Sequence, residues 1–315
     1  MTIATLLEER AEVLFDIRCS VGESPVWDVT RNRLWWVDAG ANAIWWADMD
    51  GSAPACAPLD IAPSFIALSD SGVICVAAGQ GWHAFDPNTR CLILLAQPAA
   101  APTESWRMND GTVDAQGRIW TGSIGLPRGD ASLGALFRFS ADGVHLMADD
   151  LLTQNGLAVT PDGKTLYLAD SHPSRAVIWA YDLDPHSGHI SNRRVFHRCD
   201  GGRPDGAAMD VAGGYWFALI DGGQIVRLDP SGAVTHRIPM SVSHPTNLCF
   251  GGPDMTRVFV TSMRASLSDA DMTTQPLAGG VFSFHAPFVG ALMTPAGSYI
   301  EPAESRQTGR RPILH

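Results

Sequence analysis

Several features are missing from this sequence, and each absence narrows the class of protein. No apolar run approaches the length needed to cross a bilayer, so we predict no membrane-spanning segment. Residues 1–19 carry acids where a signal peptide needs bases, and they lack a long apolar core, so we expect a cytoplasmic protein. Charged residues make up only 17% of the chain, and 33 acids against 22 bases give a formal net charge of −11. That sign argues against nucleic acid as a partner and better suits a neutral or electrophilic small molecule.

Three catalytic or metal-binding signatures are also absent. The 6 cysteines form no C-x-x-C motif, which favours buried thiols in a reducing cytosol. The 10 histidines form no H-E-x-x-H or H-x-H motif, so nothing indicates a histidine-rich zinc site. No G-x-S-x-G occurs, which disfavours a serine acyl-enzyme.

Turn residues are abundant, and they separate short apolar segments. The chain has 31 glycines and 21 prolines, and runs such as 33–38 (RLWWVD) and 215–220 (YWFALI) lie between them. Apolar runs of four to six residues, bounded by turn signals, are typical of strands and too short for helices. The sequence therefore predicts an all-β protein.

The strands repeat with a period that predicts their arrangement. Six similar segments, spaced by 41 to 50 residues, begin at Glu23, Ser64, Asn109, Asn155, Asp205 and Thr246. This spacing is typical of a four-stranded propeller blade. We predict a six-bladed β-propeller comprising residues 1–315 as one domain, with a short N-terminal lead over 1–12 and a loosely ordered tail over 301–315. The alternative is a β-sandwich or barrel with accidental spacing.

The first residue of every segment is polar, although an apolar strand follows it. In a propeller, equivalent positions of successive blades form a ring around the axis, so these six side chains should meet at one mouth of the central channel. Carboxylate and amide oxygens without histidine or cysteine suit a hard cation such as Ca²⁺, Mg²⁺ or Mn²⁺. Taken singly, Asn155-Gly156 and Asp205-Gly206 are equally consistent with turns.

Several motifs resemble those of the senescence marker protein-30/gluconolactonase family. They are G-E-S-P-x-W (22–27), R-M-N-D-G (107–111), W-T-G (120–122), N-G-L-A-x-x-P-D-G-x-x-L-Y-x-x-D-S (155–171), R-P-D-G (203–206) and P-T-x-x-x-F-G-G (245–252). The resemblance covers roughly residues 12–300. It implies a six-bladed propeller with a divalent metal in its channel and hydrolysis of sugar lactones to aldonic acids.

The resemblance also implies roles for individual residues. Glu23, Asn155 and Asp205 would be the metal ligands, and Asp205 would also be the general base. Asn109 would lie beside the metal, and Arg107 would bind substrate oxygens. One divalent ion is expected, with Ca²⁺, Zn²⁺, Mn²⁺, Mg²⁺ and Fe²⁺ all left open because oxygen-ligand sites accept several ions.

Two parts of the chain are candidates for the pocket wall. The segment 123–134 is expected to overhang the mouth, and its small residues would permit a mobile lid. Its Arg128 and Asp130 are interpreted as a solvated pair in preference to substrate contacts. His244 could line the pocket and bind substrate, and its alternative role is structural.

The sequence leaves more than one function open. A metal-dependent sugar lactonase is favoured, because a bound cation can polarise the lactone carbonyl or lower the pKa of a bound water. A non-catalytic calcium-binding propeller or regulatory scaffold is the alternative, since propellers serve both purposes. Another ester or an organophosphate as substrate is a third option. The sugar, its ring size and the oligomeric state are not predicted.

Overall fold

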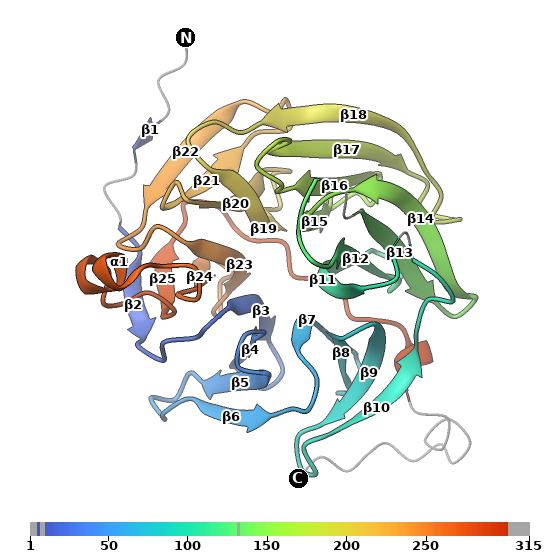
Figure 1. The fold of residues 1–315 in the computed structure, drawn as a ribbon, viewed down its shortest axis with the longest axis horizontal. Coiled ribbons are helices and arrows are strands. Elements are labelled where there is room, and N and C mark those ends of the chain that lie inside the picture. Colours follow the sequence, from blue (N-terminus) through green and yellow to red (C-terminus); the bar gives the residue numbers. More distant parts are fainter. Residues whose placement is uncertain (1–4, 7–9, 102, 131–132, 302–315) are drawn as a thin grey trace.

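The strands of this protein form a ring of six sheets. Its structure is a computed structural model that describes residues 5–6, 10–101, 103–130 and 133–301. Six sheets, which we call blades, radiate from a central axis (Figure 1). The predicted all-β, six-bladed propeller is therefore confirmed.

Each of the first five blades is built from four consecutive antiparallel strands, and the first of the four lies innermost. The sixth blade takes its outermost strand from the N-terminal region. From the inside outwards, the first three blades are β3 (Gly22–Asp28), β4 (Arg33–Asp38), β5 (Ala43–Asp48) and β6 (Ala55–Pro58); β7 (Pro63–Leu68), β8 (Ile74–Ala78), β9 (Gly81–Asp86) and β10 (Cys91–Ala96); and β11 (Trp106–Val113), β12 (Ile119–Gly125), β13 (Gly134–Ser140) and β14 (Gly143–Leu151). The next two are β15 (Gln154–Val159), β16 (Thr165–Asp170), β17 (Val177–Leu183) and β18 (Ile190–Arg198); and β19 (Arg203–Met209), β20 (Tyr215–Ile220), β21 (Gln224–Leu228) and β22 (Val234–Pro239).

The sixth blade joins the two ends of the chain. Its inner strands are β23 (Pro245–Gly251), β24 (Arg257–Ser262) and β25 (Val281–His285), and its outermost strand is β2 (Glu12–Phe15) from the N-terminal region (Figure 1). Strand β1 (Thr5–Leu6) pairs in parallel with the outside of the fifth blade. This closure leaves no open gap between the first and last blades.

The predicted ends of the chain need correction. Residues 5–6 and Glu12, expected to belong to an N-terminal lead, are strand residues. Strand β2 was hard to predict because it is short and its side chains are exposed or half-buried, so no apolar alternation marks it. The predicted tail 301–315 lies outside the described residues except for Glu301.

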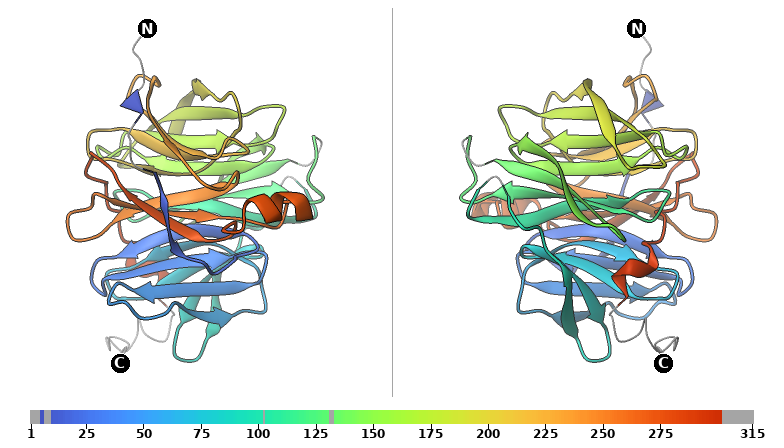
Figure 2. Two further views of the ribbon diagram at one scale, coloured as in Figure 1. Left: turned by 90° about the vertical axis from the view of Figure 1, so that its left-hand side faces the viewer. Right: turned by 90° about the vertical axis from the view of Figure 1, so that its right-hand side faces the viewer.

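Helices are minor elements among the described residues. They are α1 (Asp269–Thr274), which lies on the outside of the ring beside the sixth blade (Figure 1; Figure 2), and the 3-10 helix η1 (Ser298–Ile300). Neither has the length and hydropathy needed to cross a membrane.

The innermost strand of every blade has a β-bulge at the corresponding position of the repeat. The pairing register with the second strand shifts between Glu23 and Val26, Pro63 and Phe65, Met108 and Gly111, Asn155 and Ala158, Pro204 and Ala207, and Pro245 and Asn247. Such bulges bend a strand and redirect its side chains. Each one falls at or beside the polar residue that the repeat predicted, so all six blades present a redirected polar segment to the axis.

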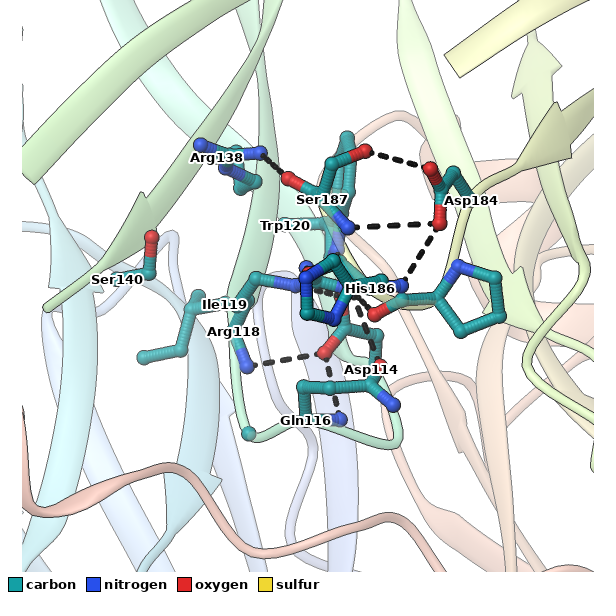
Figure 3. Close-up of polar contacts among 12 residues, drawn as sticks. Asp114, Gln116, Arg118, Ile119, Trp120, Arg138, Ser140, Asp184, His186 and Ser187 are labelled. Carbon is teal, nitrogen blue, oxygen red and sulfur yellow. Dashed lines mark hydrogen bonds and ion pairs between the residues drawn. The ribbon is translucent and has the colours of Figure 1, made fainter. Parts of the chain in front are cut away.

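Buried ion pairs hold the other end of some blades in place. Asp114, after β11, accepts hydrogen bonds from Arg118 Nε (2.6 Å) and Trp120 Nε1 (2.9 Å). Arg118 also donates to the carbonyl oxygens of Pro185 and His186, which ties the third blade to a turn of the fourth (Figure 3). These contacts make the inner strands a rigid support for the opposite mouth.

Candidate active site

Carboxylates from three blades converge at the axis. Glu23 lies in β3, Asp110 in β11 and Asp205 in β19. Asp110 affects the ionisation of the other two, and Asp205 affects that of Glu23. Burial, followed by repulsion from Asp205 and Asp110, raises the pKa of Glu23 well above its usual range. Burial and the charge of Asp110 raise the pKa of Asp205 to about 7. The site therefore concentrates negative charge that nothing in the protein alone fully balances.

The Asp205 carboxylate is incompletely satisfied. Its side chain is 6% exposed, and its Oδ1 atom finds no hydrogen-bond partner among the described residues. An unpartnered buried carboxylate oxygen is costly unless a ligand or ion meets it. Together with the raised pKa of Glu23, this oxygen fits the expected divalent cation.

The predicted metal ligands are not all carboxylate, imidazole or thiolate groups. Within the described residues, no group of three or more His, Cys, Asp or Glu side chains has the arrangement of a metal site. The predicted set of Glu23, Asn155 and Asp205 contains two carboxylates and one amide. An amide oxygen is a good ligand for hard cations, so this mixed set remains suited to one.

A chain of amide hydrogen bonds orients the third predicted ligand. Asn109 Nδ2 donates to Asn155 Oδ1 at 2.5 Å and to the carbonyl oxygen of Gln154 at 2.7 Å. Arg107 Nη1 donates to Asn109 Oδ1 at 3.0 Å, and Asn155 Nδ2 donates to Ser171 Oγ at 3.0 Å. The Asn155 amide is thus held at both ends, and its oxygen retains a second lone pair.

Replacing Asn109 with alanine should weaken cation binding about tenfold or more, because groups that orient a ligand contribute this much to metal affinity. Calorimetric titration of the chelated protein with Ca²⁺ and with Mn²⁺ would measure the change. Ser64→Ala is the matched control, with unchanged affinity expected. An N109A protein that binds both ions as tightly as the wild type would contradict the role of Asn109 in holding Asn155.

The two remaining members of the ring are engaged elsewhere. Ser64 Oγ donates to the carbonyl oxygen of Ala77 at 3.2 Å. Thr246 Oγ1 donates to the carbonyl oxygen of Gly22 and lies 3.0 Å from Thr261 Oγ1. Both hydroxyls serve to fasten strands, and the structure does not bring them into the carboxylate cluster.

Two further polar residues at the axis were not among the predicted site residues. Asp110 accepts hydrogen bonds from the Leu157 backbone N–H (2.9 Å) and, across the axis, from Asn247 Nδ2 (3.1 Å). Asn247 also lowers the pKa of Glu23 through a side-chain hydrogen bond. Each follows a ring residue directly in the sequence, and this position in the repeat is the signal that could have found them.

Two glycines of the recognised motifs make room for these polar groups. A Cβ at Gly206 would overlap the Asn247 amide, and a Cβ at Gly122 would overlap the side chain of Gln154, the neighbour of Asn155. These contacts explain glycine in R-P-D-G and in W-T-G. In both motifs, the glycine therefore leaves room for a side chain of the neighbouring blade.

Charged groups lie near these carboxylates, and we call them the rim: Arg107, Arg128, Arg203, Asp221 and His244. Arg203 Nε donates to Asp221 Oδ2 at 2.7 Å, and His244 Nε2 lies 3.0 Å from Asp221 Oδ1. His244 Nδ1 also lies 3.0 Å from Ser243 Oγ. The structure thus places His244 in an ion-pair chain beside the site, and its contact with substrate stays a prediction.

The expected loop 123–134 is shorter in the structure. Residues 123–125 continue β12, and β13 begins at Gly134. Asp130 does not pair with Arg128, as the sequence interpretation had it, since Asp130 Oδ1 lies 3.5 Å from His172 Nδ1 and near Ser174 Oγ. Sequence proximity suggested the wrong partner, because the fourth blade supplies a closer one.

A cavity lies beyond the predicted ligands. It measures 590 Å³ and is lined by later residues of the inner strands, including Asp110 and Asn247, and by the segment 291–295. Glu23, Asn155 and Asp205 do not line it. Asp110 and Asn247, which hydrogen-bond across the axis, border this cavity, and both also act on Glu23.

The fold and site together define a six-bladed propeller with a cluster of buried carboxylates and amides on its axis. Residues 21–264 match the model of the SMP-30/Gluconolactonase/LRE-like region. The chain belongs to this family, which confirms the resemblance seen in the motifs.

Individual relatives cover nearly the whole fold. The 6-deoxy-6-sulfogluconolactonase of Pseudomonas putida is 36% identical over 84% of this chain and 90% of its own length. Regucalcin of Bos taurus is 32% identical over 87% of this chain and 93% of its own. The crystal structure of a calcium-binding protein, regucalcin, from Agrobacterium tumefaciens superposes with a TM-score of 0.86 at 26% identity, covering 93% of this chain and 99% of that one.

Proposed function

We propose that this protein hydrolyses a sugar lactone to the corresponding aldonic acid with the aid of one divalent cation. The observation that carries the proposal is the buried Asp205 Oδ1 atom, which has no hydrogen-bond partner in the described part of the chain and lies near a second carboxylate of raised pKa. The family and the sulfogluconolactonase relative support a lactone as the substrate.

Glu23, Asn155 and Asp205 would hold the cation. Two carboxylates would balance its charge, and the amide held by Asn109 would complete a set of three protein ligands. When bound, a cation of this kind supplies a positive charge that stabilises the oxyanion developing on the lactone carbonyl. Three protein ligands leave room for substrate or water.

The residues of the chain supply positioning and proton transfer. Water attacks the lactone carbonyl carbon, the bond between that carbon and the ring oxygen breaks, and the proton removed from water finally reaches the ring oxygen. Asp205 would take up this proton and return it to the ring oxygen. Arg107, whose Nη1 atom already donates to neutral oxygens at the rim, would donate to substrate oxygens.

A binding protein without catalysis is the second candidate, because two of the similar proteins carry the name regucalcin and one is titled calcium-binding. The same residues would hold the cation in either case. The two functions differ in whether acid is released from a lactone.

Acid release from D-glucono-1,5-lactone and other aldonolactones should depend on added cation. We expect hydrolysis above the uncatalysed rate in a pH-stat assay, its loss by at least about a hundredfold after chelation, and its return with Ca²⁺, Mn²⁺ or Zn²⁺. Calorimetric cation binding without any acid release would favour the scaffold. Activity that survives complete removal of metal would contradict the proposed role of the cation.

A further inference from the structure

Two guanidinium groups of the rim lack an acidic hydrogen-bond partner. Arg107 hydrogen-bonds only to the neutral oxygens of Met108 and Asn109 among the described residues. The exposed Arg128 has no hydrogen bond or ion pair with any residue that the structure describes. Arg203, by contrast, is paired with Asp221. The rim therefore offers two cationic groups that are free to meet an anion.

Strand pairing places Arg128 close to Arg107. Arg107 is the register partner of Ile124, and Trp106 is that of Gly125, the last residue of β12. The loop leaves from this point, where the Leu126 backbone N–H donates to the Ser105 carbonyl oxygen at 2.8 Å. Further along, Asp130 contacts His172 of the neighbouring blade. Arg128 thus lies between two anchored ends of a loop that starts at the site.

The charges of neighbouring groups agree with this placement. Arg128 contributes, after the larger effect of burial, to a lowering of the pKa of Arg107 to about 10. Arg128 is therefore near enough to act on Arg107.

The local charge differs in sign from that of the whole chain. The protein has a formal net charge of −11, which by itself favours a neutral ligand. A divalent cation would neutralise Glu23 and Asp205, and Arg203 is neutralised by Asp221. Arg107 and Arg128 then outweigh the single carboxylate of Asp110, and the mouth becomes positive in an acidic protein, a contrast that attracts small anions.

We propose that Arg128 makes this site selective for sugar lactones that carry an anionic substituent, such as a carboxylate, sulfonate or phosphate, away from the reacting carbonyl. The inference rests on the proposed lactonase function and names the substrate class of the same site. Arg107 engages oxygens near the lactone ring, and the Arg128 guanidinium pairs with the anion through charge-assisted hydrogen bonds.

The test compares lactones that differ in one substituent. The KM and kcat of the metal-loaded wild type would be measured for D-glucono-1,5-lactone and for analogues with a carboxylate, a sulfonate or a phosphate at carbon 6. We expect the KM for at least one anionic analogue to be about tenfold lower than that for the neutral lactone, consistent with one charge-assisted contact. The three analogues distinguish which anion is preferred.

Variants separate Arg128 from a general effect of charge. R128Q should raise the KM for the preferred anionic lactone about tenfold more than that for the neutral lactone, and R128K should retain part of the preference. R198Q is the matched control, since Arg198 is also exposed but lies in the outermost strand β18, and its preference should equal that of the wild type. Added salt should raise the anionic KM in the wild type and much less in R128Q.

Two results would overturn the inference while leaving the lactonase proposal intact. One is a wild type that turns over the neutral lactone at least as well as every anionic analogue. The other is an R128Q protein with the full anionic preference. A wild type that hydrolyses none of these lactones would instead refute the proposed function, and this inference with it.

Discussion

Replacing Asp205 with asparagine should reduce kcat/KM for lactone hydrolysis by about a thousandfold or more, because the variant loses a proposed cation ligand and the proposed base together. The same variant should be more stable than the wild type when both are free of metal. D205N removes a buried charge that repels Glu23 and Asp110, which we expect to raise the free energy of unfolding at pH 8 by on the order of 2 kcal/mol. Steady-state kinetics and chemical denaturation in the presence of chelator would measure the two effects.

Asp210→Asn provides the matched control for D205N. Asp210 is fully buried just after the same strand, and it accepts hydrogen bonds from Arg227 Nε (2.7 Å) and Trp216 Nε1 (2.8 Å). Loss of this paired charge should lower the free energy of unfolding by about 3 kcal/mol while the folded protein keeps its kcat/KM. The two aspartates should thus have opposite effects. A D205N protein with wild-type turnover would refute the assignment of Asp205 to the site.

Cation affinity should fall steeply as the solution becomes more acidic. The ligands bind a cation in their ionised forms, and protons compete with it at Asp205, whose pKa is raised to about 7, and at Glu23, whose pKa is also raised. At pH 5 about one Asp205 side chain in a hundred is ionised, so the dissociation constant for Ca²⁺ should be about a hundredfold larger than at pH 8.

The sign of the linked stability effect follows from the direction of these shifts. A carboxyl whose pKa is higher in the folded state than in the unfolded state makes folding less favourable as the pH rises from about 4 towards 7. Added cation should remove this penalty at pH 8 and have little effect at pH 5.

Thermal unfolding with and without Ca²⁺ at each pH would measure this difference. The buried His83 and the half-buried His197, whose pKa values are lowered by desolvation, contribute equally to both samples at one pH, so their effects cancel. An increase in unfolding temperature on adding Ca²⁺ that is as large at pH 5 as at pH 8 would show that ionised Glu23 and Asp205 are not the binding groups.

The sequence repeat was sufficient to predict the blades and the level at which the polar residues lie. Each blade buries the same faces against its neighbours, so the same pattern of apolar and turn residues recurs along the chain. The polar residue near the start of each inner strand stands out against this pattern, which is why the ring of six could be singled out without coordinates. The family resemblance then pointed to Glu23, Asn155 and Asp205 as its metal ligands. Strand β2 escaped notice because its few side chains are only partly buried.

Contacts between different blades could not be predicted in this way. The bond from Asn247 to Asp110 joins residues 137 positions apart, and the pairing of Asp130 with His172 replaces a partner two residues away. Neither follows from the pattern, because a repeat specifies the position of a residue within its own blade and not the neighbour that it meets.

The sequence by itself determined the architecture and the identity of the polar ring, because side chains that are buried periodically require apolar residues at periodic positions. Only the tertiary structure decided which ring members retain a free oxygen, as Asp205 does, and which use it to fasten strands, as Ser64 and Thr246 do. The same holds for the charge at the mouth, where Arg107 and Arg128 have no acidic hydrogen-bond partner among the described residues of an acidic chain. Hydrogen-bond satisfaction and local charge depend on which groups lie within a few ångströms of one another. The composition of the chain does not contain these distances.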